Sequence, residues 1–214
     1  MPESGGLTDA QARRKRAFDL AVGGTALIIT SPIMVLGVAA ATVSTRQWGV
    51  FSQERIGLDA RPFYVHKVRS MRQLDGVTTT VTAGSDPRIT KVGAWLRRLK
   101  IDELPQLVNV VRGEMSLVGP RPDVAGWADA LEGADRVVLS VRPGITGPAS
   151  VHFRHEEDIL AAVDEPELHN RQVIWPEKVR LNREYVENWS LRADLRWILA
   201  TVASVVDRRG TGAR

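Results

Sequence analysis

The longest hydrophobic segment of the chain lies near its N-terminus. Residues 20–45 contain no charge, follow the basic sequence RRKR at 13–16, and are closed by Arg46. A helix that spans a bilayer needs about 20 consecutive apolar residues, so this segment is long enough to enter a membrane. A cleaved signal peptide is disfavoured, because its apolar region would have only about 7 to 15 residues.

Ser31 and Pro32 interrupt this segment near its middle. Proline lacks an N–H and clashes with the carbonyl four residues earlier, so Pro32 predicts a break, with the Ser31 hydroxyl available to the freed backbone groups. Residues 20–31 and 32–45 would then reach about 18 Å and 21 Å, short of a hydrocarbon core of about 30 Å. Two short helices with basic residues at both ends favour a re-entrant hairpin. A spanning helix with a proline kink stays open, because membrane helices tolerate such kinks.

The pattern after this segment predicts small elements. Residues 50–55 and 62–68 are rich in β-formers and flank a glycine-containing turn at 57–61, which predicts a β-hairpin. Residues 72–87 are rich in Thr, Gly, Ser and Asp and predict a loop or lid. Residues 89–99 have apolar positions at helical spacing and end in two arginines, which predicts a short helix.

A C-terminal amphipathic helix is predicted over residues 191–207. Its apolar positions follow helical spacing, and arginines lie at both of its ends. Such a helix can cover the core or lie in the membrane interface, and the pattern leaves both interpretations open. Trp189 and Trp197 favour the interface, where indole rings are enriched.

Composition narrows the function classes. The 214 residues suffice for one domain plus an anchor, and the net charge of +4 with a pI near 9.8 indicates an anionic partner. The absence of cysteine excludes disulfides and a thiol nucleophile, and none of the four histidines has zinc-hydrolase spacing. Nucleic acid is disfavoured, because the basic residues surround apolar segments and two tyrosines offer little surface for stacking.

Asp102 and Glu103 are the strongest candidates for chemistry. We expect a helix to start with Asp102 as its N-cap and to stop at Gly113, with Pro105 tolerated in the first turn. Taken alone, an aspartate at that position indicates ordinary capping. However, cations surround the pair in the sequence, which supports an anion site at the helix N-terminus. These cations are Arg97, Arg98, Lys100 and Arg112.

Two arginines in proline- and glycine-containing turns extend this candidate site. Arg121 has a proline on each side, so its guanidinium is presented by a stiff backbone, as suits a bidentate phosphate contact. Arg142 precedes a turn in which Gly144 and Gly147 would permit a backbone to approach a phosphate closely. Both segments also fit plain turns without a ligand.

Taken together, the chain resembles the monotopic phosphoglycosyl transferases, a family of bacterial sugar transferases, from residue 15 to residue 206. The block at 86–122 is the most specific part of the resemblance. The segments that carry it are KRAFDLAVGGTALIITSPIMVL, VFSQERIGLDARPFYVHKVRSM, SDPRITKVGAWLRRLKIDELPQLVNVVRGEMSLVGPRP, VRPGITGPASV and YVENWSLRADLRWIL.

The resemblance implies a definite reaction. Asp102 would attack the β-phosphorus of a UDP-sugar and release UMP, and polyprenyl phosphate would then attack the sugar-phosphoryl aspartate. Glu103 would act with Mg²⁺ and in activation of the acceptor, so that Asp102 and Glu103 are the expected metal ligands. Arg97 would bind phosphate. Such an enzyme is a sugar-phosphate transferase that initiates the assembly of a glycan such as an exopolysaccharide.

The remaining substrate contacts are assigned to four cations. Lys67 and Arg69 occupy the cationic positions of the KVRSM segment, and Arg121 and Arg142 are the arginines described above. The resemblance also implies that the segment around Ser31-Pro32 is re-entrant. The protein would then be monotopic on the cytoplasmic face of the bacterial inner membrane. The association of two copies into a homodimer stays open.

The expected fold is a helix-rich α/β domain without a large parallel sheet. It would have a re-entrant helix-break-helix membrane hairpin, one small β-hairpin and interfacial amphipathic helices. Its expected parts are a flexible basic N-terminus (1–16), the membrane segment (17–46), a catalytic domain (47–207) and a tail (208–214). Two positions depart from the family pattern: Asn182, where members often carry an acidic residue, and Pro148, where tryptophan is common.

Overall fold

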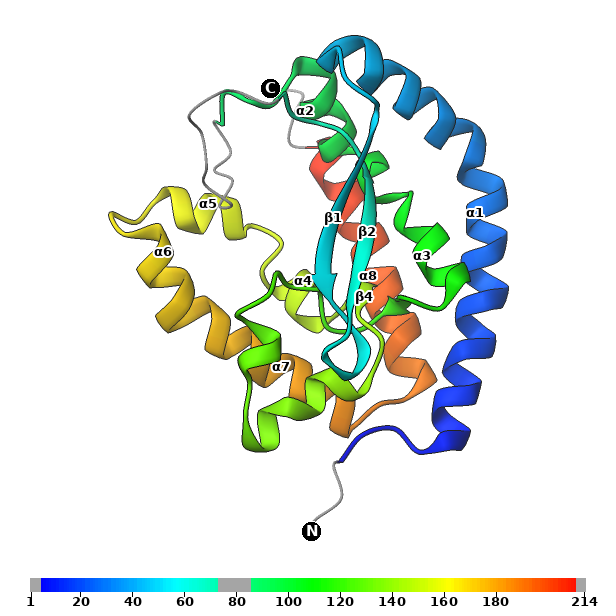
Figure 1. Ribbon diagram of the computed structural model, residues 1–214, viewed down its shortest axis with the longest axis vertical. Coiled ribbons are helices and arrows are strands. Elements are labelled where there is room, and N and C mark those ends of the chain that lie inside the picture. The colour runs from blue at the N-terminus through cyan, green and yellow to red at the C-terminus, as the bar shows by residue number, and fades with distance from the viewer. Residues whose placement is uncertain (1–4, 73–85, 211–214) are drawn as a thin grey trace.

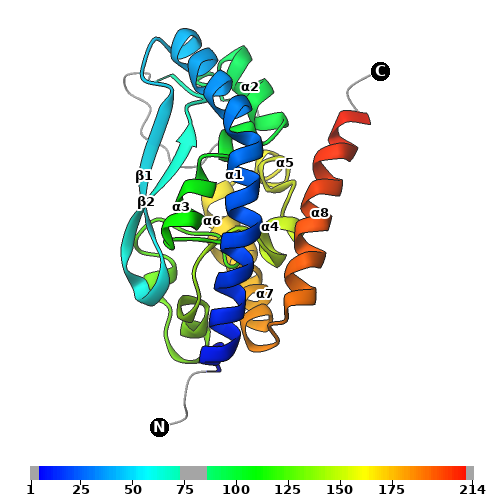
Figure 2. The ribbon, with the colours of Figure 1, turned by 90° about the vertical axis from the view of Figure 1, so that its right-hand side faces the viewer.

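The computed structural model describes residues 5–72 and 86–210, except for the side chains at 157 and 205–210. In this part of the chain helices dominate, and the two sheets have two strands each. A long helix, α1, runs along one side of the molecule, and α8 rises in the same direction (Figures 1 and 2). The predicted helix-rich α/β class is confirmed, whereas the predicted loop at 72–87 lies almost entirely outside the described residues.

Helix α1 (Asp9–Thr45) begins with a capping box. The backbone N–H of Thr8 donates to Gln11 Oε1 at 2.8 Å, and Thr8 Oγ1 accepts from the Gln11 N–H at 3.3 Å. Arg46 ends the helix in the left-handed conformation, with φ 57°. The prediction of a flexible segment through residue 16 is therefore wrong for residues 9–16, because this cap starts the helix earlier.

The predicted helix break at Ser31-Pro32 is also wrong, because α1 continues through both residues. Pro32 removes the N–H that would otherwise bond to the carbonyl of Ile28. The hydroxyl of Ser31 donates to that same carbonyl at 2.9 Å, so the acceptor stays satisfied. Figure 1 shows that the helix bends towards its C-terminal end, where it passes over α2. Re-entrant insertion stays a prediction.

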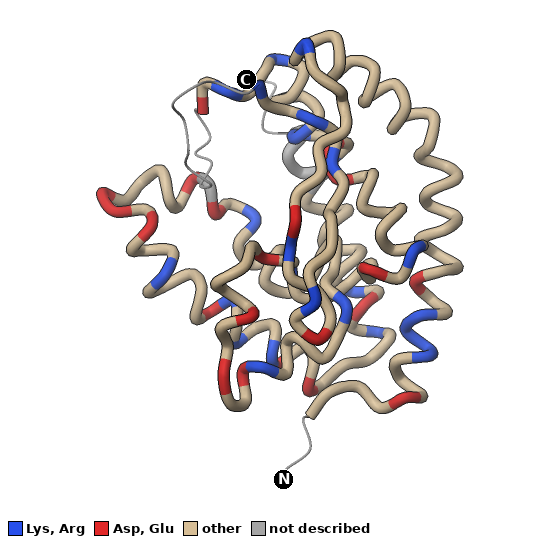
Figure 3. Tube along the Cα trace, in the orientation of Figure 1, with Lys and Arg blue, Asp and Glu red and all other residues tan. Residues whose placement is uncertain are grey.

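The outward face of α1 is apolar and unusually exposed. Ile28, Ile29, Leu36 and Val43 have exposed fractions of 75%, 69%, 70% and 81%. In Figure 3 no charged residue marks the upper part of the helix. By length and composition α1 is the one helix of the described residues that could cross a membrane.

The predicted β-hairpin is confirmed by β1 (Val50–Ile56) and β2 (Pro62–Val68), which pair antiparallel, with Val50 opposite Val68. The connecting turn contains the 3₁₀ segment η1 (Leu58–Ala60). The helix predicted over 89–99 is α2 (Lys91–Arg98), whose N-cap is Thr90.

A second sheet, which the pattern did not predict, joins β3 (Ser116–Val118) and β4 (Gly144–Thr146) in parallel. A Cβ atom on Gly144 would lie 2.1 Å from Gly119 N, and one on Gly147 would lie 2.3 Å from Gly119 O. These glycines do permit a close backbone approach, but the neighbour is the backbone after β3 rather than a phosphate.

Apart from η2 (Ile101–Glu103), which lies between α2 and α3, the other helical elements follow or separate these strands. They are α3 (Gln106–Arg112), η3 (Ala128–Ala130), η4 (Gly133–Ser140), α4 (Pro148–His152), α5 (Glu156–Ala161), α6 (Pro166–His169), the π-helical turn η5 (Asn170–Ile174), α7 (Trp175–Glu187) and α8 (Leu191–Gly210). The tail predicted from residue 208 is thus helical to residue 210. The main core lies between α1, α3, β3 and the α7–α8 corner, and it includes Val110, Met115, Val118, Tyr185 and Val186.

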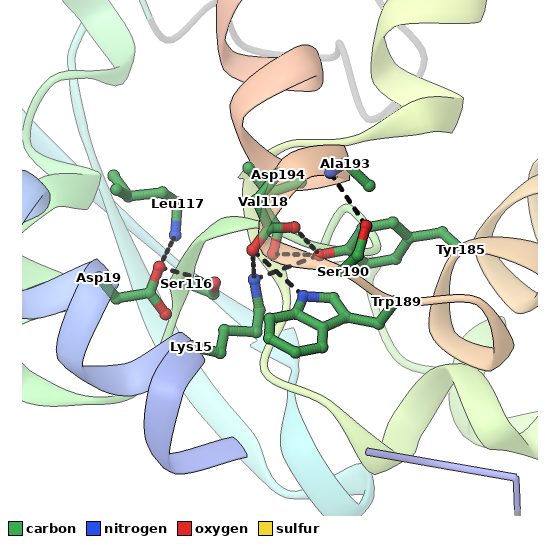
Figure 4. A network of polar contacts seen from close by, with 10 residues as sticks. All are labelled: Lys15, Asp19, Ser116, Leu117, Val118, Tyr185, Trp189, Ser190, Ala193 and Asp194. Carbon is green, nitrogen blue, oxygen red and sulfur yellow. Dashed lines mark hydrogen bonds and ion pairs between the residues drawn. The ribbon is translucent and has the colours of Figure 1, made fainter. Parts of the chain in front are cut away.

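Buried polar contacts fasten the start of α1 to the domain (Figure 4). Lys15 Nζ lies 2.7 Å from Asp194 Oδ2, and Tyr185 Oη donates to Asp194 Oδ1 at 2.6 Å. One turn further along α1, Asp19 Oδ1 accepts from the Ser116 hydroxyl and from the next backbone N–H, each at 3.0 Å. Lys15, which belongs to the basic sequence before the apolar segment, is therefore buried in the domain.

Helix α8 has apolar side chains on two faces. Trp197 and Ile198 pack against the main core, whereas Leu199 and Val202 are 67% and 56% exposed. Trp189, which the sequence suggested as an interfacial anchor, is buried, and its indole N–H donates to Asp194. Attachment of α8 to a membrane interface stays a prediction that Trp189 does not support.

Candidate active site

Asp102 and Glu103 lie in a 3₁₀ turn, η2 (Ile101–Glu103), between α2 and α3. Lys100 enters this turn in the left-handed conformation, with φ 57°, which reverses the chain after α2. Helix α3 starts only at Gln106, and Pro105 occupies its N-cap position. The prediction that Asp102 is an N-cap is therefore wrong, because the chain makes a separate 3₁₀ turn before the helix.

The turn η2 packs against α1, α2 and β2. A Cβ atom on Gly37 of α1 would lie only 3.1 Å from Ile101 Cγ2, so a glycine lets the long helix approach the turn closely. The carboxylates thus lie beside the half of α1 that carries its exposed apolar face.

One oxygen of the Asp102 carboxyl takes no part in the hydrogen bonding of the fold. This atom, Oδ1, is buried and has no hydrogen-bond partner among the described residues. Burial and the neighbouring charge of Glu103 raise the pKa of Asp102 above its usual value, while Lys100, Lys67 and Arg97 act in the opposite direction. A buried carboxylate without a hydrogen bond costs free energy, which is typical of a functional group rather than a cap.

Glu103 is held differently from its neighbour. Its side chain is 13% exposed, and its Oε1 lies 3.0 Å from Arg121 Nη2 and 3.8 Å from Lys100 Nζ. Burial by itself would raise the pKa of Glu103, but the charges of Arg121, Lys100 and Lys67 outweigh burial and hold this pKa far below its usual value. Glu103 is therefore ionised, and two adjacent carboxyls have opposite pKa shifts.

Three of the predicted substrate-binding cations act on this pair. Burial, followed by the charge of Arg121, lowers the pKa of Lys67 to about 8, and the carboxyls of Glu103 and Asp102 oppose this shift. Arg97, in the last turn of α2, lowers the pKa of Asp102. The structure thus brings Arg97, Lys67 and Arg121 to the two carboxyls, from α2, β2 and the segment after β3.

The position of Arg121 depends on the β3–β4 pair. Beyond β3, the N–H of Gly119 donates to the Thr146 carbonyl, and the N–H of Gly144 donates to the Pro120 carbonyl, each at 2.8 Å. The following arginine therefore projects from a backbone whose two preceding residues are held by hydrogen bonds. This places Arg121 against Glu103 although 18 positions separate them in the chain.

The other two predicted cations have different neighbours. Arg69 Nε donates to the Trp48 carbonyl at 2.8 Å, and its guanidinium lies 5.4 Å from the ring centroid of Phe51. Arg142 Nε donates to the Gly113 carbonyl at 2.7 Å. The roles of Arg69 and Arg142 in substrate binding stay predictions, since these contacts join segments of the fold.

A second group of charges, which the sequence analysis missed, borders Arg121. Burial raises the pKa of Asp123 to about 6, although Lys178, Arg55 and Arg121 oppose this effect. Lys178 is itself paired with Glu156 at 2.7 Å. In the sequence, only the position of Asp123 directly after the PRP segment at 120–122 pointed to this group of charges. Its other members come from elements that are distant in the chain.

The carboxyls that could bind a metal are few. Within residues 5–72 and 86–210, no three side chains of the types His, Cys, Asp and Glu are grouped as a metal site. Mg²⁺ is usually held by one or two carboxylates together with substrate phosphates. The unpaired oxygen of Asp102 and the adjacent ionised Glu103 fit that arrangement, so the residues present are compatible with a metal that binds along with a phosphate substrate.

Comparisons with known proteins give the family of the chain. Residues 10–208 match the family model described as bacterial sugar transferase. The exopolysaccharide production protein ExoY of Rhizobium meliloti (strain 1021) is 32% identical, and the match covers 98% of this chain and 92% of ExoY.

Two longer relatives are similar over part of their length. The undecaprenyl-phosphate glucose phosphotransferase of Komagataeibacter xylinus is 38% identical over 92% of this chain and 36% of its own length. The UDP-glucose:undecaprenyl-phosphate glucose-1-phosphate transferase of Escherichia coli (strain K12) is 36% identical over 88% of this chain and 39% of its own. The chain thus spans less than half of these two relatives. The match over residues 10–208 shows that the chain belongs to the bacterial sugar transferase family.

Proposed function

We propose that this chain transfers a sugar 1-phosphate from a UDP-sugar to a polyprenyl phosphate and releases UMP. The observation that carries the proposal is the Oδ1 atom of Asp102, which is buried and lacks a hydrogen bond among the described residues, in a carboxyl with Lys100, Lys67 and Arg97 as neighbouring cations. The printed names of two relatives, which specify UDP-glucose or undecaprenyl phosphate, support the substrate classes. The name of ExoY supports a role in exopolysaccharide assembly.

The reaction has two displacements at the same phosphorus. An oxygen of ionised Asp102 attacks the β-phosphorus of the UDP-sugar, the bond from that phosphorus to the bridging oxygen breaks, and UMP leaves with the bonding electrons. A phosphate oxygen of the polyprenyl phosphate then attacks the sugar-phosphoryl aspartate. The bond between Asp102 and phosphorus breaks, which yields a polyprenyl diphosphate sugar and restores the carboxylate.

The cations have separate roles in this scheme. Arg121, Lys67 and Arg97 bind the pyrophosphate and offset the repulsion between it and the carboxyls. Glu103 holds Arg121 in place through the 3.0 Å contact. Magnesium, when bound by Asp102 and Glu103, would neutralise phosphate charge in the transition state.

We propose further that α1 lies in the cytoplasmic leaflet of the bacterial inner membrane without crossing it. Its exposed apolar face supports contact with lipid, and the packing of η2 against α1 would hold the carboxyls near the headgroups. An enzyme in this position can meet a water-soluble donor and a lipid-anchored acceptor at one site.

The central test is the Asp102→Asn substitution, with UMP release as the assay. We expect no turnover above background in this variant, whereas Asp158→Asn, which changes a carboxyl that is 78% exposed, should keep parental activity. The parent, given UDP-sugar without acceptor, should form a phosphosugar adduct that mass spectrometry locates on Asp102. Turnover by Asp102→Asn, or an adduct on another residue, contradicts the assignment. A parent that releases no UMP with any UDP-sugar would indicate a membrane-anchored scaffold that binds anionic lipid.

The absence of cysteine permits a clean test of topology. Single cysteines can replace Arg13, before the apolar segment, and Trp48, whose side chain after it is 69% exposed. In vesicles of known orientation, a membrane-impermeant maleimide should label both from the cytoplasmic side. Labelling from opposite sides would show that α1 spans the membrane.

A further inference from the structure

A small cavity lies on the side of Arg121 that borders Asp123. Its volume is about 20 Å³, and its walls include Gly57, Trp175 and Asn182. A cavity needs about 10–15 Å³ to hold one water molecule, so this space fits a single group of that size. The Arg121 side chain, which forms part of the wall, is 41% exposed, so the cavity lies close to solvent.

Asn182 contributes an unpaired acceptor to this cavity. The residue is only 8% exposed, and its Oδ1 atom is buried without a hydrogen-bond partner in the described part of the chain. Helix α7 carries it one turn after Lys178. A buried acceptor without a partner costs about 1–3 kcal/mol, so a donor group is expected to occupy the space in front of it.

Asp123 supplies a second acceptor in the wall. Its backbone carbonyl accepts from the Ile56 N–H at 2.8 Å, which fixes this residue against the end of β1. Its carboxyl accepts no hydrogen bond from the described residues, and the neighbouring charges are Lys178, Arg55, Arg121 and Glu156. Two oxygen acceptors in so small a space select a hydrogen-bond donor such as a hydroxyl group and disfavour a phosphate.

We propose that this cavity, with Asp123 and Asn182 as acceptors, binds one hydroxyl group of the UDP-sugar, either on the sugar or on the ribose. The proposal rests on the proposed function, because it uses Arg121 as a contact for the pyrophosphate. Arg121 contacts Glu103 and also lines the cavity, so a donor whose pyrophosphate binds there has hydroxyl-bearing rings next to the cavity. The two acceptors then contribute to donor specificity.

The test combines protein variants with deoxy donors. UMP or dUMP release is measured for the parent, Asp123→Ala and Asn182→Ala, with UDP-sugars that lack one sugar hydroxyl or one ribose hydroxyl. For the parent, one deoxy donor should have a kcat/KM at least fivefold lower, which corresponds to about 1 kcal/mol for a lost hydrogen bond. In both variants the ratio of kcat/KM for the complete donor to kcat/KM for this deoxy donor should fall to about 1, mainly because KM for the complete donor rises.

The control is Glu132→Ala, which removes an exposed carboxyl outside the cavity and should keep the parental discrimination. The critical deoxy donor identifies whether the hydroxyl belongs to the sugar or the ribose. If Asn182→Ala does not fold, Asp123→Ala alone decides, since residue 123 lies outside the helices and strands. Unchanged discrimination for every deoxy donor overturns the cavity as a subsite and leaves the proposed reaction intact, whereas a parent without UMP release overturns both.

Discussion

Removal of the buried Asp194 charge should destabilise the protein more than any surface ion pair does. Asp194 is fully buried and accepts from Lys15 Nζ at 2.7 Å, from Tyr185 Oη at 2.6 Å and from Trp189 Nε1 at 3.2 Å (Figure 4). Burial and the charge of Asp194 raise the pKa of Tyr185, so its hydroxyl stays a donor. One carboxylate thus joins α1, α7 and α8.

The magnitude follows from what the substitution leaves behind. The Lys15 side chain is only 6% exposed, and without Asp194 it keeps, among the described residues, only Asp19 as a carboxyl neighbour, whose Oδ1 already accepts from Ser116 and Leu117. Breaking a buried pair in this way costs about 3–5 kcal/mol. We expect Asp194→Asn near the lower value, because its amide oxygen can still accept from Tyr185 or Trp189, and Asp194→Ala near the upper value.

Thermal unfolding of the detergent-solubilised protein, followed by circular dichroism, measures this effect. In a chain of this size 1 kcal/mol shifts Tm by about 2–4 °C, so Asp194→Asn should lower Tm by about 6–12 °C. The double variant Lys15→Met/Asp194→Asn should recover at least half of the Tm that Asp194→Asn loses, because Lys15 no longer leaves a buried cation. Arg180→Ala is the matched control. It removes ion pairs to Glu177 and Glu184 from an arginine that is 52% exposed, and it should leave Tm close to that of the parent, because solvent screens exposed pairs.

Two results would refute this reasoning. If Asp194→Asn unfolds within 2 °C of the parent, the Lys15 charge must be hydrated in solution. If the double variant is less stable than Asp194→Asn by the full effect of Lys15→Met, the two residues are not coupled, and the start of α1 is attached by its apolar contacts alone.

Further predictions concern the site and the turns that position it. The pKa of Lys67 is about 8, so the KM for the donor should rise above that pH as Lys67 loses its charge. Lys67→Arg, which stays charged, should remove this rise in KM at alkaline pH. A rise that persists in the variant excludes Lys67 as its source. Gly144→Ala should destabilise the fold and lower UMP release, because the added Cβ atom would lie 2.1 Å from Gly119 N. Gly24→Ala is the control and should be tolerated, because its added Cβ atom would have no neighbour within 4 Å. Equal Tm values for the two variants would contradict this prediction. Asp123 has a pKa of about 6 in the folded protein against an ordinary value of 3.8, so the native state binds this proton more tightly than the unfolded state does. The free energy of unfolding should therefore fall between pH 4 and pH 6, by at most about 3 kcal/mol. Asp123→Asn should remove this fall, and a variant with the parental pH profile of unfolding would disprove the assignment to Asp123.

The amino-acid sequence by itself determined the features that depend on neighbouring residues. The uncharged run at 20–45 predicted a helix long enough for a membrane, and the β-formers around the turn at 57–61 predicted the hairpin. The cations around Asp102 indicated an anion site. Each of these patterns acts through local backbone preference or local charge, so an element can be inferred before its packing is known.

Only the tertiary structure decided which distant residues meet and which charges are buried. It keeps α1 continuous because the Ser31 hydroxyl satisfies the Ile28 carbonyl. It places Arg121 beside Glu103 through the parallel pair β3–β4, which no pattern of neighbouring residues in the sequence predicts. It also shifts the pKa values of Asp102 and Glu103 in opposite directions, because burial and the arrangement of charges in space, rather than residue type, determine the cost of ionisation.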